Sequence, residues 1–364
     1  MPAGTDAAVP EAITRPRRLL IVCPSWLGDC VMATPALRRL RQGMPGALLG
    51  ALVRPGMDEL FEGSGLFDQV HVARSTGIMG PKHAAAKVRP DRYDAAVLLS
   101  NSFSTALIAR LAWIPRRIGY ARDARSLLLT DAIAPALRPD GRYAIVPAVT
   151  YYLRLADHLL GRPHDAEDLG EALCLGLSTK QQQASDDLLA RAGLSPQTPR
   201  AILNPGGNNP AKRWPADRFA ALARHLHEDR GLRVLVNGSP GERALITEII
   251  ELAGVPCVSL PDLGVTIGSL KGVVRGSRLM VSNDTGPRHI AAAFGVPLVS
   301  LFGPTDARWT TIPTRPTPRG RPGEQILRAD ESLDPAESAN DHPERCRIDR
   351  ISVDRVLQAV DEAL

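Results

Sequence analysis

The sequence predicts an α/β protein of two lobes, each an open parallel sheet covered by helices. Its 364 residues exceed one ordinary hydrophobic core and suit two domains of roughly 150 residues each. In both halves, short continuous apolar runs alternate with amphipathic stretches of helical length, which is typical of parallel βαβ units buried on both faces. A hydrophobic content of 44% with 23% charged residues indicates a folded, soluble protein.

The first lobe is expected over residues 18–175, after a small, polar segment, residues 1–17, that we expect to be disordered. From Leu19 onward the apolar and amphipathic segments alternate as RLLIVCP, DCVMATPALRRLRQG, GALLGALVRPG, MDELFEG, FDQVHVAR, YDAAVLLSNS and STALIARLAWI. The lobe ends in a long helical stretch, VPAVTYYLRLADHLLG.

The domain boundary is expected near residues 165–198, where this helical stretch leads into the polar, Gln-rich STKQQQASDDLLARAGLSPQTPR, and the second lobe is expected over residues 176–345. The alternation restarts as AILNPGG, ADRFAALARHLHEDRG, RVLVNGS, ERALITEIIELAG, VTIGSLKGVVRGS, RLMVSND, HIAAAFG and PLVSLFG. Residues 346–364 contain SVDRVLQAVDEAL, with an N-cap at Ser352 and apolar positions at i, i+3, i+4 and i+7. This pattern predicts a C-terminal helix that docks on a domain surface.

Composition excludes several classes of protein. The apolar run LLIVC ends at Pro24, far short of the roughly 18 residues of a membrane span, and no cleavage site follows it. Five cysteines without CxxC pairs predict reduced thiols in the cytoplasm and no structural zinc. A net charge of +5 favours anionic partners, but basic patches interleaved with aromatic residues are missing, so we expect no nucleic-acid binding.

The first candidate site is the turn PSWLGDCVMATPAL, which holds Ser25 and Asp29 between a strand and a helix. In open parallel sheets, ligands bind outside the carboxyl ends of the strands, where such turns lie. Asp29 has two interpretations. It could cap the helix, or it could act as a general base that accepts a proton from an attacking hydroxyl.

Two further turns follow strands of the second lobe. In NPGGNNPAKRWP, Gly206 and Gly207 permit close approach of the backbone, and Lys212 supplies a point charge suited to a pyrophosphate. A solvated loop is the alternative. In VNGSPGERA, Glu242 either interacts with the helix dipole or accepts the hydroxyls of a ribose.

The fourth turn lies in VSNDTGPRHIAAAFGVPLVSLFGPT. Asp284, Thr285 and Gly286 introduce a helix whose N-terminus favours a phosphate, and His289 follows one turn later. His289 is either a packing residue or a group that binds phosphate and stabilises a leaving group. One carboxylate and one imidazole make a poor metal site, so we expect no metal and no cofactor. The second polar turn, residues 303–305, is either a wall of the pocket or a tight exit from the strand.

Together, these turns resemble the lipopolysaccharide heptosyltransferase family, glycosyltransferase family 9, and within it the heptosyltransferase II group. The matching segments are PSWLGDCVMATPAL, LLSNSFSTALIARLAWIPRRIGY, NPGGNNPAKRWPADRFAALA, SNDTGPRHIAAAFGVPLVSLFGPT and CRIDRISVDRVLQAV, which span residues 19–360. The resemblance implies a GT-B fold, in which two Rossmann-like domains face each other across a cleft. It also implies an inverting transfer by direct displacement without a metal ion.

The resemblance implies a role for each matching residue. Asp29 matches the family's general base, and the acceptor is expected on the N-terminal domain. The donor, ADP-heptose, is expected mainly on the C-terminal domain, at Gly207, Asn208, Lys212, Glu242, Asp284, Thr285, Gly286 and His289. Candidate acceptor contacts, each of which could instead be an ordinary surface group, are Ser25, Arg54, Arg116, Arg117 and Arg122.

The function implied is transfer of L-glycero-D-manno-heptose from ADP-heptose to the heptose of the lipopolysaccharide inner core. The acceptor would be lipid A–Kdo–heptose, and the protein would be cytoplasmic and peripheral to the inner face of the cytoplasmic membrane. Three alternatives remain open: a family member with another donor or acceptor, a GT-B-like nucleotide-sugar epimerase, and a non-catalytic binding protein.

Overall fold

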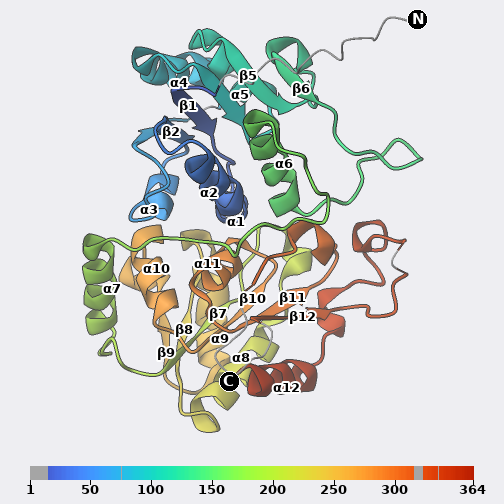
Figure 1. The fold of residues 1–364 in the computed structure, drawn as a ribbon. Coiled ribbons are helices and arrows are strands. Elements are labelled where there is room, and N and C mark those ends of the chain that lie inside the picture. The colour runs from blue at the N-terminus through green and yellow to red at the C-terminus, as the bar shows by residue number, and fades with distance from the viewer. Residues whose placement is uncertain (1–14, 75, 315–322, 335) are drawn as a thin grey trace, which may run out of the picture.

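The computed structural model describes residues 15–74, 76–314, 323–334 and 336–364. Most of the expected tail, residues 1–14, therefore lies outside the described residues. Two six-stranded sheets form the centres of two lobes, which lie one above the other in Figure 1. No helix in the described part of the chain is long and apolar enough to cross a membrane.

The N-terminal lobe contains a fully parallel sheet in the order β3-β2-β1-β4-β5-β6. Its strands are β1 (Arg18–Val22), β2 (Leu48–Val53), β3 (Gln69–Val72), β4 (Ala95–Leu98), β5 (Arg116–Tyr120) and β6 (Asp131–Ile133). Its helices are α1 (Leu27–Met32), α2 (Thr34–Gly43), α3 (Met57–Phe61), α4 (Gly80–Val88), α5 (Phe103–Leu111) and α6 (Ala148–Leu160).

The C-terminal lobe contains a second fully parallel sheet, in the order β12-β11-β10-β7-β8-β9. Its strands are β7 (Arg200–Asn204), β8 (Arg233–Val236), β9 (Cys257–Ser259), β10 (Leu279–Asn283), β11 (Leu298–Phe302) and β12 (Glu324–Arg328). Its helices are α7 (Thr179–Arg191), α8 (Ala216–Glu228), α9 (Arg243–Ala253), α10 (Ile267–Arg275), α11 (Gly286–Phe294) and α12 (Val353–Ala363).

Both sheets have the strand order of the Rossmann fold, counted from the first strand of each lobe. The order reverses between β1 and β4 in one sheet and between β7 and β10 in the other. Every residue of β7 and β10 is buried, as the continuous apolar runs predicted. The predicted α/β fold with two Rossmann-like sheets is confirmed. The predicted C-terminal helix is α12, which buries Val356 and Val360 against the C-terminal lobe and contacts α8 and β11.

A buried lysine joins the lobes on one side. The Nζ atom of Lys271, on α10, donates hydrogen bonds to the carbonyl oxygens of Glu59, Leu60 and Glu62 at the end of α3, at 2.9, 3.1 and 2.9 Å. In return, the carboxylate of Glu59 accepts a hydrogen bond of 2.7 Å from the backbone N–H of Gly268. Burial lowers the pKa of Lys271 to about 8. Each helix end thus receives a side chain of the charge that its dipole favours.

The lobes also touch where α1 meets α11. The first turn of each helix contains a glycine, and the two helix starts pack so closely that neither glycine position has room for a side chain. A Cβ atom on Gly28 would lie 2.8 Å from Nδ1 of His289, and one on Gly286 would lie 3.0 Å from Cδ2 of Leu27. The sequence therefore places glycine where two helix starts from different lobes approach closely.

We predict that Gly28→Ala lowers the midpoint of thermal unfolding, because the added methyl group collides with a ring that is itself buried. Overpacking of this kind costs about 1–3 kcal/mol. Gly46→Ala is the matched control, since a Cβ atom there meets no other atom within 4 Å. Circular dichroism during heating measures both variants. Equal midpoints for the two variants would contradict the close contact.

Candidate active site

Two cavities lie on either side of the α1–α11 contact. The larger, of about 500 Å³, is lined mainly by the turns that follow β7, β8 and β10, and residues 26–28 of the N-terminal lobe close it. The smaller, of about 250 Å³, is lined by Asp29 and other residues of the N-terminal lobe, together with Trp309 and Thr310 of the C-terminal lobe. The turns that face each other belong to the switch points of the two sheets, where ligands bind in open α/β folds.

Glu242 fixes the two turns that form one wall of the larger cavity. Its Oε1 accepts a hydrogen bond of 2.7 Å from the N–H of Gly207, and its Oε2 accepts bonds from the N–H and Oγ of Ser239, at 2.7 and 2.9 Å. Burial alone would raise the pKa of Glu242, but these bonds outweigh it and lower the pKa. A Cβ atom on Gly206 would lie 2.2 Å from Oε1, so only glycine fits there. Glu242 is therefore an ionised acceptor that faces the cavity and positions Gly207.

Two asparagines, which the sequence did not single out, link three turns of the larger cavity. The amide of Asn237 donates a hydrogen bond of 2.7 Å to Oδ1 of Asn204, whose own amide donates one of 2.6 Å to Oγ1 of Thr285. Both strands β7 and β8 lead into an asparagine, a signal that is visible in AILN and VLVN. Asn208 is exposed and lines the same cavity.

Asp284 and Lys212 form an ion pair at the floor of the larger cavity. The distance between Lys212 Nζ and Asp284 Oδ2 is 2.9 Å, and Thr305 Oγ1 donates a hydrogen bond of 3.1 Å to the same oxygen. Burial would raise the pKa of Asp284, but the positive charges of Lys212 and Arg288 outweigh burial and lower it. Thr285 and Gly286 line the cavity at the N-terminus of α11, so a cation and a helix N-terminus converge there.

His289 lies away from the larger cavity. Its side chain is buried beneath Gly28, and the residue is only 3% exposed. Nδ1 is 3.3 Å from the carbonyl oxygen of Gly286. Burial, with the nearby charge of Arg288, lowers the pKa of His289 to about 3, so the ring is neutral. One helical turn thus carries this side chain into the contact between the lobes, and the direct donor contact of His289 stays a prediction.

Asp29 lies in the first turn of α1 and faces the smaller cavity. The N-cap residue of this helix is Trp26, without a side-chain capping bond, so Asp29 is not its N-cap. Instead, Oδ1 of Asp29 accepts a hydrogen bond of 3.2 Å from the hydroxyl of Tyr152 on α6. Burial raises the pKa of Asp29, and the charge of Asp284 raises it further, whereas the bond from Tyr152 lowers it; the net shift is upward.

Aromatic residues and one arginine are part of the lining of the smaller cavity. Tyr151 and Tyr152 lie on α6, and Trp309 belongs to a 3₁₀ turn, Ala307–Thr310, of the other lobe. The guanidinium carbon of Arg122 lies 3.7 Å from the centre of the Tyr143 ring. The sequence did not identify the aromatic residues as site residues, because their spacing there is that of an ordinary helix face and a loop.

Two of the predicted acceptor contacts are corrected by the structure. Arg116 and Arg117 begin strand β5, and the amino ends of parallel strands lie at the sheet edge opposite the site. Arg116 forms an ion pair of 2.9 Å with Asp131. Arg117 donates hydrogen bonds to nearby carbonyl oxygens, including one of 2.6 Å to that of Ile114.

The other predicted acceptor contacts lie at the site edge of the sheet. Ser25 belongs to the turn after β1, and its carbonyl oxygen accepts a hydrogen bond of 3.2 Å from Arg54. Arg122 follows the carboxyl end of β5 and lines the smaller cavity.

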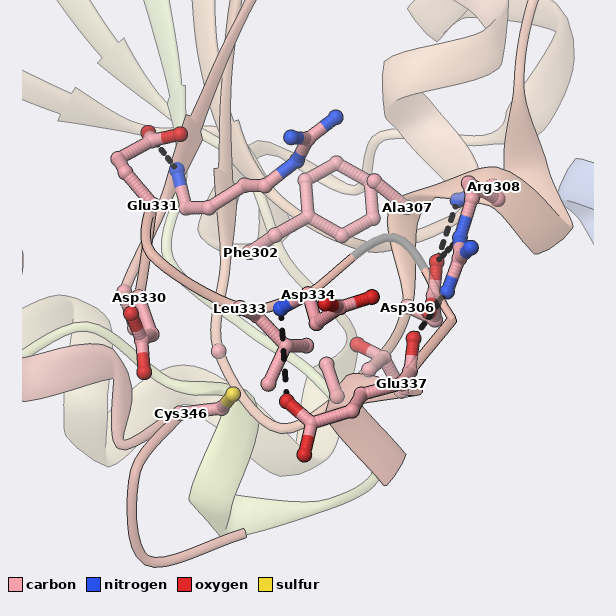
Figure 2. A pocket seen from close by; sticks show the side chains of 15 residues that line it. Phe302, Asp306, Ala307, Arg308, Asp330, Glu331, Leu333, Asp334, Glu337 and Cys346 are labelled. Carbon is pink, nitrogen blue, oxygen red and sulfur yellow. Dashed lines mark hydrogen bonds and ion pairs between the residues drawn. The ribbon is translucent and has the colours of Figure 1, made fainter. Parts of the chain in front are cut away.

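A third cavity, of about 260 Å³, lies beyond the turn at residues 303–305 and is acidic. Figure 2 shows Asp306 beside Arg308, and Glu337 turned toward the backbone N–H of Asp334. Asp330 is paired with Arg345 at 3.0 Å, so these carboxylates already have partners. No group of three or more His, Cys, Asp and Glu side chains in the described residues could hold a metal ion. Thr305 lines this cavity, and its hydroxyl donates a hydrogen bond to Asp284, which lines the larger cavity.

Known proteins match both the sequence and the fold. The family model "Glycosyltransferase family 9 (heptosyltransferase)" matches residues 83–321. Lipopolysaccharide heptosyltransferase 2 of Escherichia coli K12 is 29% identical over 302 residues, which cover 80% of this chain and 84% of that protein.

Solved structures agree with this assignment. The structure of E. coli ADP-heptose LPS heptosyltransferase II superposes with a TM-score of 0.75 at 26% identity, over 95% of this chain and 98% of the other. A glycosyltransferase family 9 structure from Veillonella parvula has a TM-score of 0.77 at 19% identity, over 95% and 97% of the two chains, and shows the shared fold. The chain therefore belongs to glycosyltransferase family 9, the heptosyltransferases, and is a glycosyltransferase with the GT-B fold of that family.

Proposed function

We propose that the protein transfers a heptose from ADP-heptose to the heptose of the lipopolysaccharide inner core, with inversion at the anomeric carbon and with Asp29 as general base. The observation that carries this proposal is the position of Asp29. Asp29 lines the smaller cavity with aromatic rings and Arg122, and the residue before it, Gly28, lines the larger cavity, which also contains a cation and a helix N-terminus. The similarity to heptosyltransferase II supports the choice of donor and acceptor.

The larger cavity suits a nucleotide diphosphate sugar. Its volume of about 500 Å³ lies in the usual range of ligand pockets. One wall is apolar, with Val265, Ile267 and Leu270, and would take the adenine. Glu242 would accept hydrogen bonds from the ribose, and Lys212 with the N-terminus of α11 would stabilise the diphosphate.

The smaller cavity would hold the acceptor sugar, so that its hydroxyl faces Asp29. The hydroxyl oxygen attacks the anomeric carbon from the face opposite the leaving group, which inverts the configuration. Its proton goes to Asp29 while the bond between the anomeric carbon and the diphosphate oxygen breaks, and ADP leaves with the electron pair. A raised pKa makes Asp29 a better proton acceptor than an ordinary aspartate, and Lys212 stabilises the charge that develops on ADP.

The charge distribution favours an anionic acceptor at a membrane surface. Residues 15–160 contain 20 Lys and Arg against 11 Asp and Glu, whereas in residues 161–364 acidic residues slightly outnumber basic ones. The basic lobe contains the smaller cavity. Such a lobe is attracted to anionic lipid headgroups and to a phosphorylated acceptor, which supports a peripheral location at the cytoplasmic membrane face.

An epimerase is less well supported. It would need a second free acid or base beside the sugar, but Glu242 already accepts three hydrogen bonds and Asp284 is paired with Lys212.

An assay distinguishes the proposed enzyme from a family member that uses another donor or acceptor. Release of ADP from ADP-heptose with a mono-heptosylated lipid A acceptor tests the proposal directly, and its absence with every heptosyl acceptor would overturn the assignment of the substrates.

Asp29→Asn is expected to reduce kcat by about 10²–10⁴, because an amide cannot accept the proton. ADP binding, measured by isothermal titration calorimetry, should persist, since the change removes no group from the larger cavity. Full transfer by the variant would show that Asp29 is not the base.

The pH dependence of kcat is expected to follow Asp29. Only the ionised carboxylate is a base, and its pKa is raised by burial and by Asp284, so activity falls as the pH drops through a value above the ordinary 3.8 of aspartate. His289 adds no limb near neutral pH, because its pKa is lowered to about 3. Measuring kcat across pH for the wild type and for Asp29→Asn checks this. An acidic limb that survives in Asp29→Asn belongs to another group.

Lys212→Ala should weaken ADP binding by about tenfold or more, because the ammonium group is lost while Asp284 stays buried beside the diphosphate. Lys180→Ala removes the same charge from an exposed position on α7 and serves as the control. Calorimetric titration with ADP measures both variants. If both lose affinity equally, the effect is one of net charge, and the proposed contact with the diphosphate falls.

A further inference from the structure

Tyr152 is placed where it can control the proposed base. It lies on α6, is 6% exposed, and its hydroxyl is 3.2 Å from Oδ1 of Asp29. Its neighbour Tyr151 points elsewhere: that ring stacks on Tyr120 at 3.8 Å, and its hydroxyl donates a hydrogen bond of 3.0 Å to Asn101. The two tyrosines thus have separate partners.

Helix α6 holds Tyr152 firmly. It packs against α1, which carries Asp29, and against α2, and it also contacts the 3₁₀ turn that holds Trp309. Its buried face includes Val149, Leu153 and Ala156, which surround Tyr152 along the helix. A side chain held in this way offers a hydroxyl whose position is set by the packing of the lobe rather than by solvent.

Asp29 needs such a partner. Its helix is short, and the carboxylate makes no capping bond at the helix start. Without a fixed hydrogen bond, a carboxylate rotates about its last torsion angle, which is broad, and presents either oxygen to the acceptor. General base catalysis requires one oxygen within hydrogen-bond reach of the acceptor hydroxyl.

We propose that Tyr152 is the positioning residue of the base: its hydroxyl holds Oδ1 of Asp29 and leaves Oδ2 to accept the proton of the acceptor. The inference rests on the proposed function, since it gives a partner to the base of that reaction. Tyr152 acts through Asp29 and takes no proton itself. Burial, with the charge of Asp29, keeps its own pKa well above the usual value, so the hydroxyl remains a donor.

The hydrogen bond also acts on the charge of Asp29. The titratable groups that influence Asp29 from neighbouring elements are Tyr152 on α6 and Asp284 before α11. Cys30, next to Asp29 on α1, is a neutral thiol, because burial raises its pKa. His289 on α11 is neutral as well. Of these groups, Tyr152 alone lowers the pKa of Asp29, so its removal has a predictable sign.

Tyr152→Phe tests the proposal, with two readouts. The first is the titration of the Asp29 carboxyl by ¹³C NMR of labelled aspartate, assigned by Asp29→Asn, and we expect its midpoint to move to higher pH. The second is steady-state transfer, in which kcat should fall about tenfold, as for loss of a hydrogen bond to a charged group. The acidic limb of kcat should move to higher pH as well, while KM for ADP-heptose stays within about twofold.

Tyr93→Phe is the matched control. This substitution removes the hydroxyl of a buried tyrosine in the same lobe. That hydroxyl lies 2.7 Å from Nε2 of His71, and Tyr93 precedes the amino end of β4, away from the site. We expect it to leave the Asp29 titration and the kcat profile unchanged. If Tyr152→Phe fails to fold, 3-fluorotyrosine at position 152 keeps the ring and strengthens the donor, and the Asp29 titration should then move to lower pH.

The possible outcomes separate this inference from the proposed function. An Asp29 titration that is the same with Tyr, Phe or fluorotyrosine at position 152 overturns the inference, whatever the enzyme transfers. A shifted titration with an unchanged kcat also overturns it, because the tyrosine would then tune the charge without positioning the base. If the wild type transfers no heptose, the proposed function falls, and the NMR titration still decides whether Tyr152 controls Asp29.

Discussion

The contact between the first turns of α1 and α11 is the constraint on which the site depends. Because Gly28 and Gly286 lack side chains, the two helix starts approach closely enough to bring Asp29 of one lobe near Asp284 of the other. When two carboxylates lie close together and cations lie beside only one of them, the pKa values of the two groups move apart. Burial raises the pKa of Asp29 and the negative charge of Asp284 raises it further, whereas Lys212 and Arg288 lower the pKa of Asp284. One geometric contact thus gives the two acids different chemistry.

The cation side of this contact is rigid. Arg288 is fully buried and forms an ion pair of 2.5 Å with Glu324 on β12, which fixes α11 against the edge of its sheet. Asn204 and Glu242 tie the turns after β7 and β8 to the same helix start and to each other. Polar groups whose partners are set before a ligand arrives lose little freedom when it binds, which is the requirement for stabilising charge on a leaving group.

Much of this arrangement could be predicted from the sequence. Apolar runs of strand length reveal the two sheets, and the rule that sites lie at the carboxyl ends of parallel strands points to Asp29, Lys212 and Asp284. The same rule applies in reverse to Arg116 and Arg117, which are the first two residues of their strand and so lie at the other edge of the sheet. Tyr152 and Trp309 could not be found in this way. An aromatic residue on a helix face has the same pattern whether it fills a core or touches a carboxylate, and only packing decides which.

The two sides of the α1–α11 contact differ in strength. On one side Lys271 is buried and donates three hydrogen bonds to the end of α3. Breaking them would leave a charge and three carbonyl groups without partners. On the other side, the long connection between β6 and α6, which projects from the N-terminal lobe in Figure 1, reaches Asp341 through Arg138 and Arg142 at 3.9 and 3.6 Å. Partly exposed ion pairs of this length contribute little. Separation of the lobes beside residues 134–147, several of which line the smaller cavity, therefore breaks weaker contacts than separation beside Lys271.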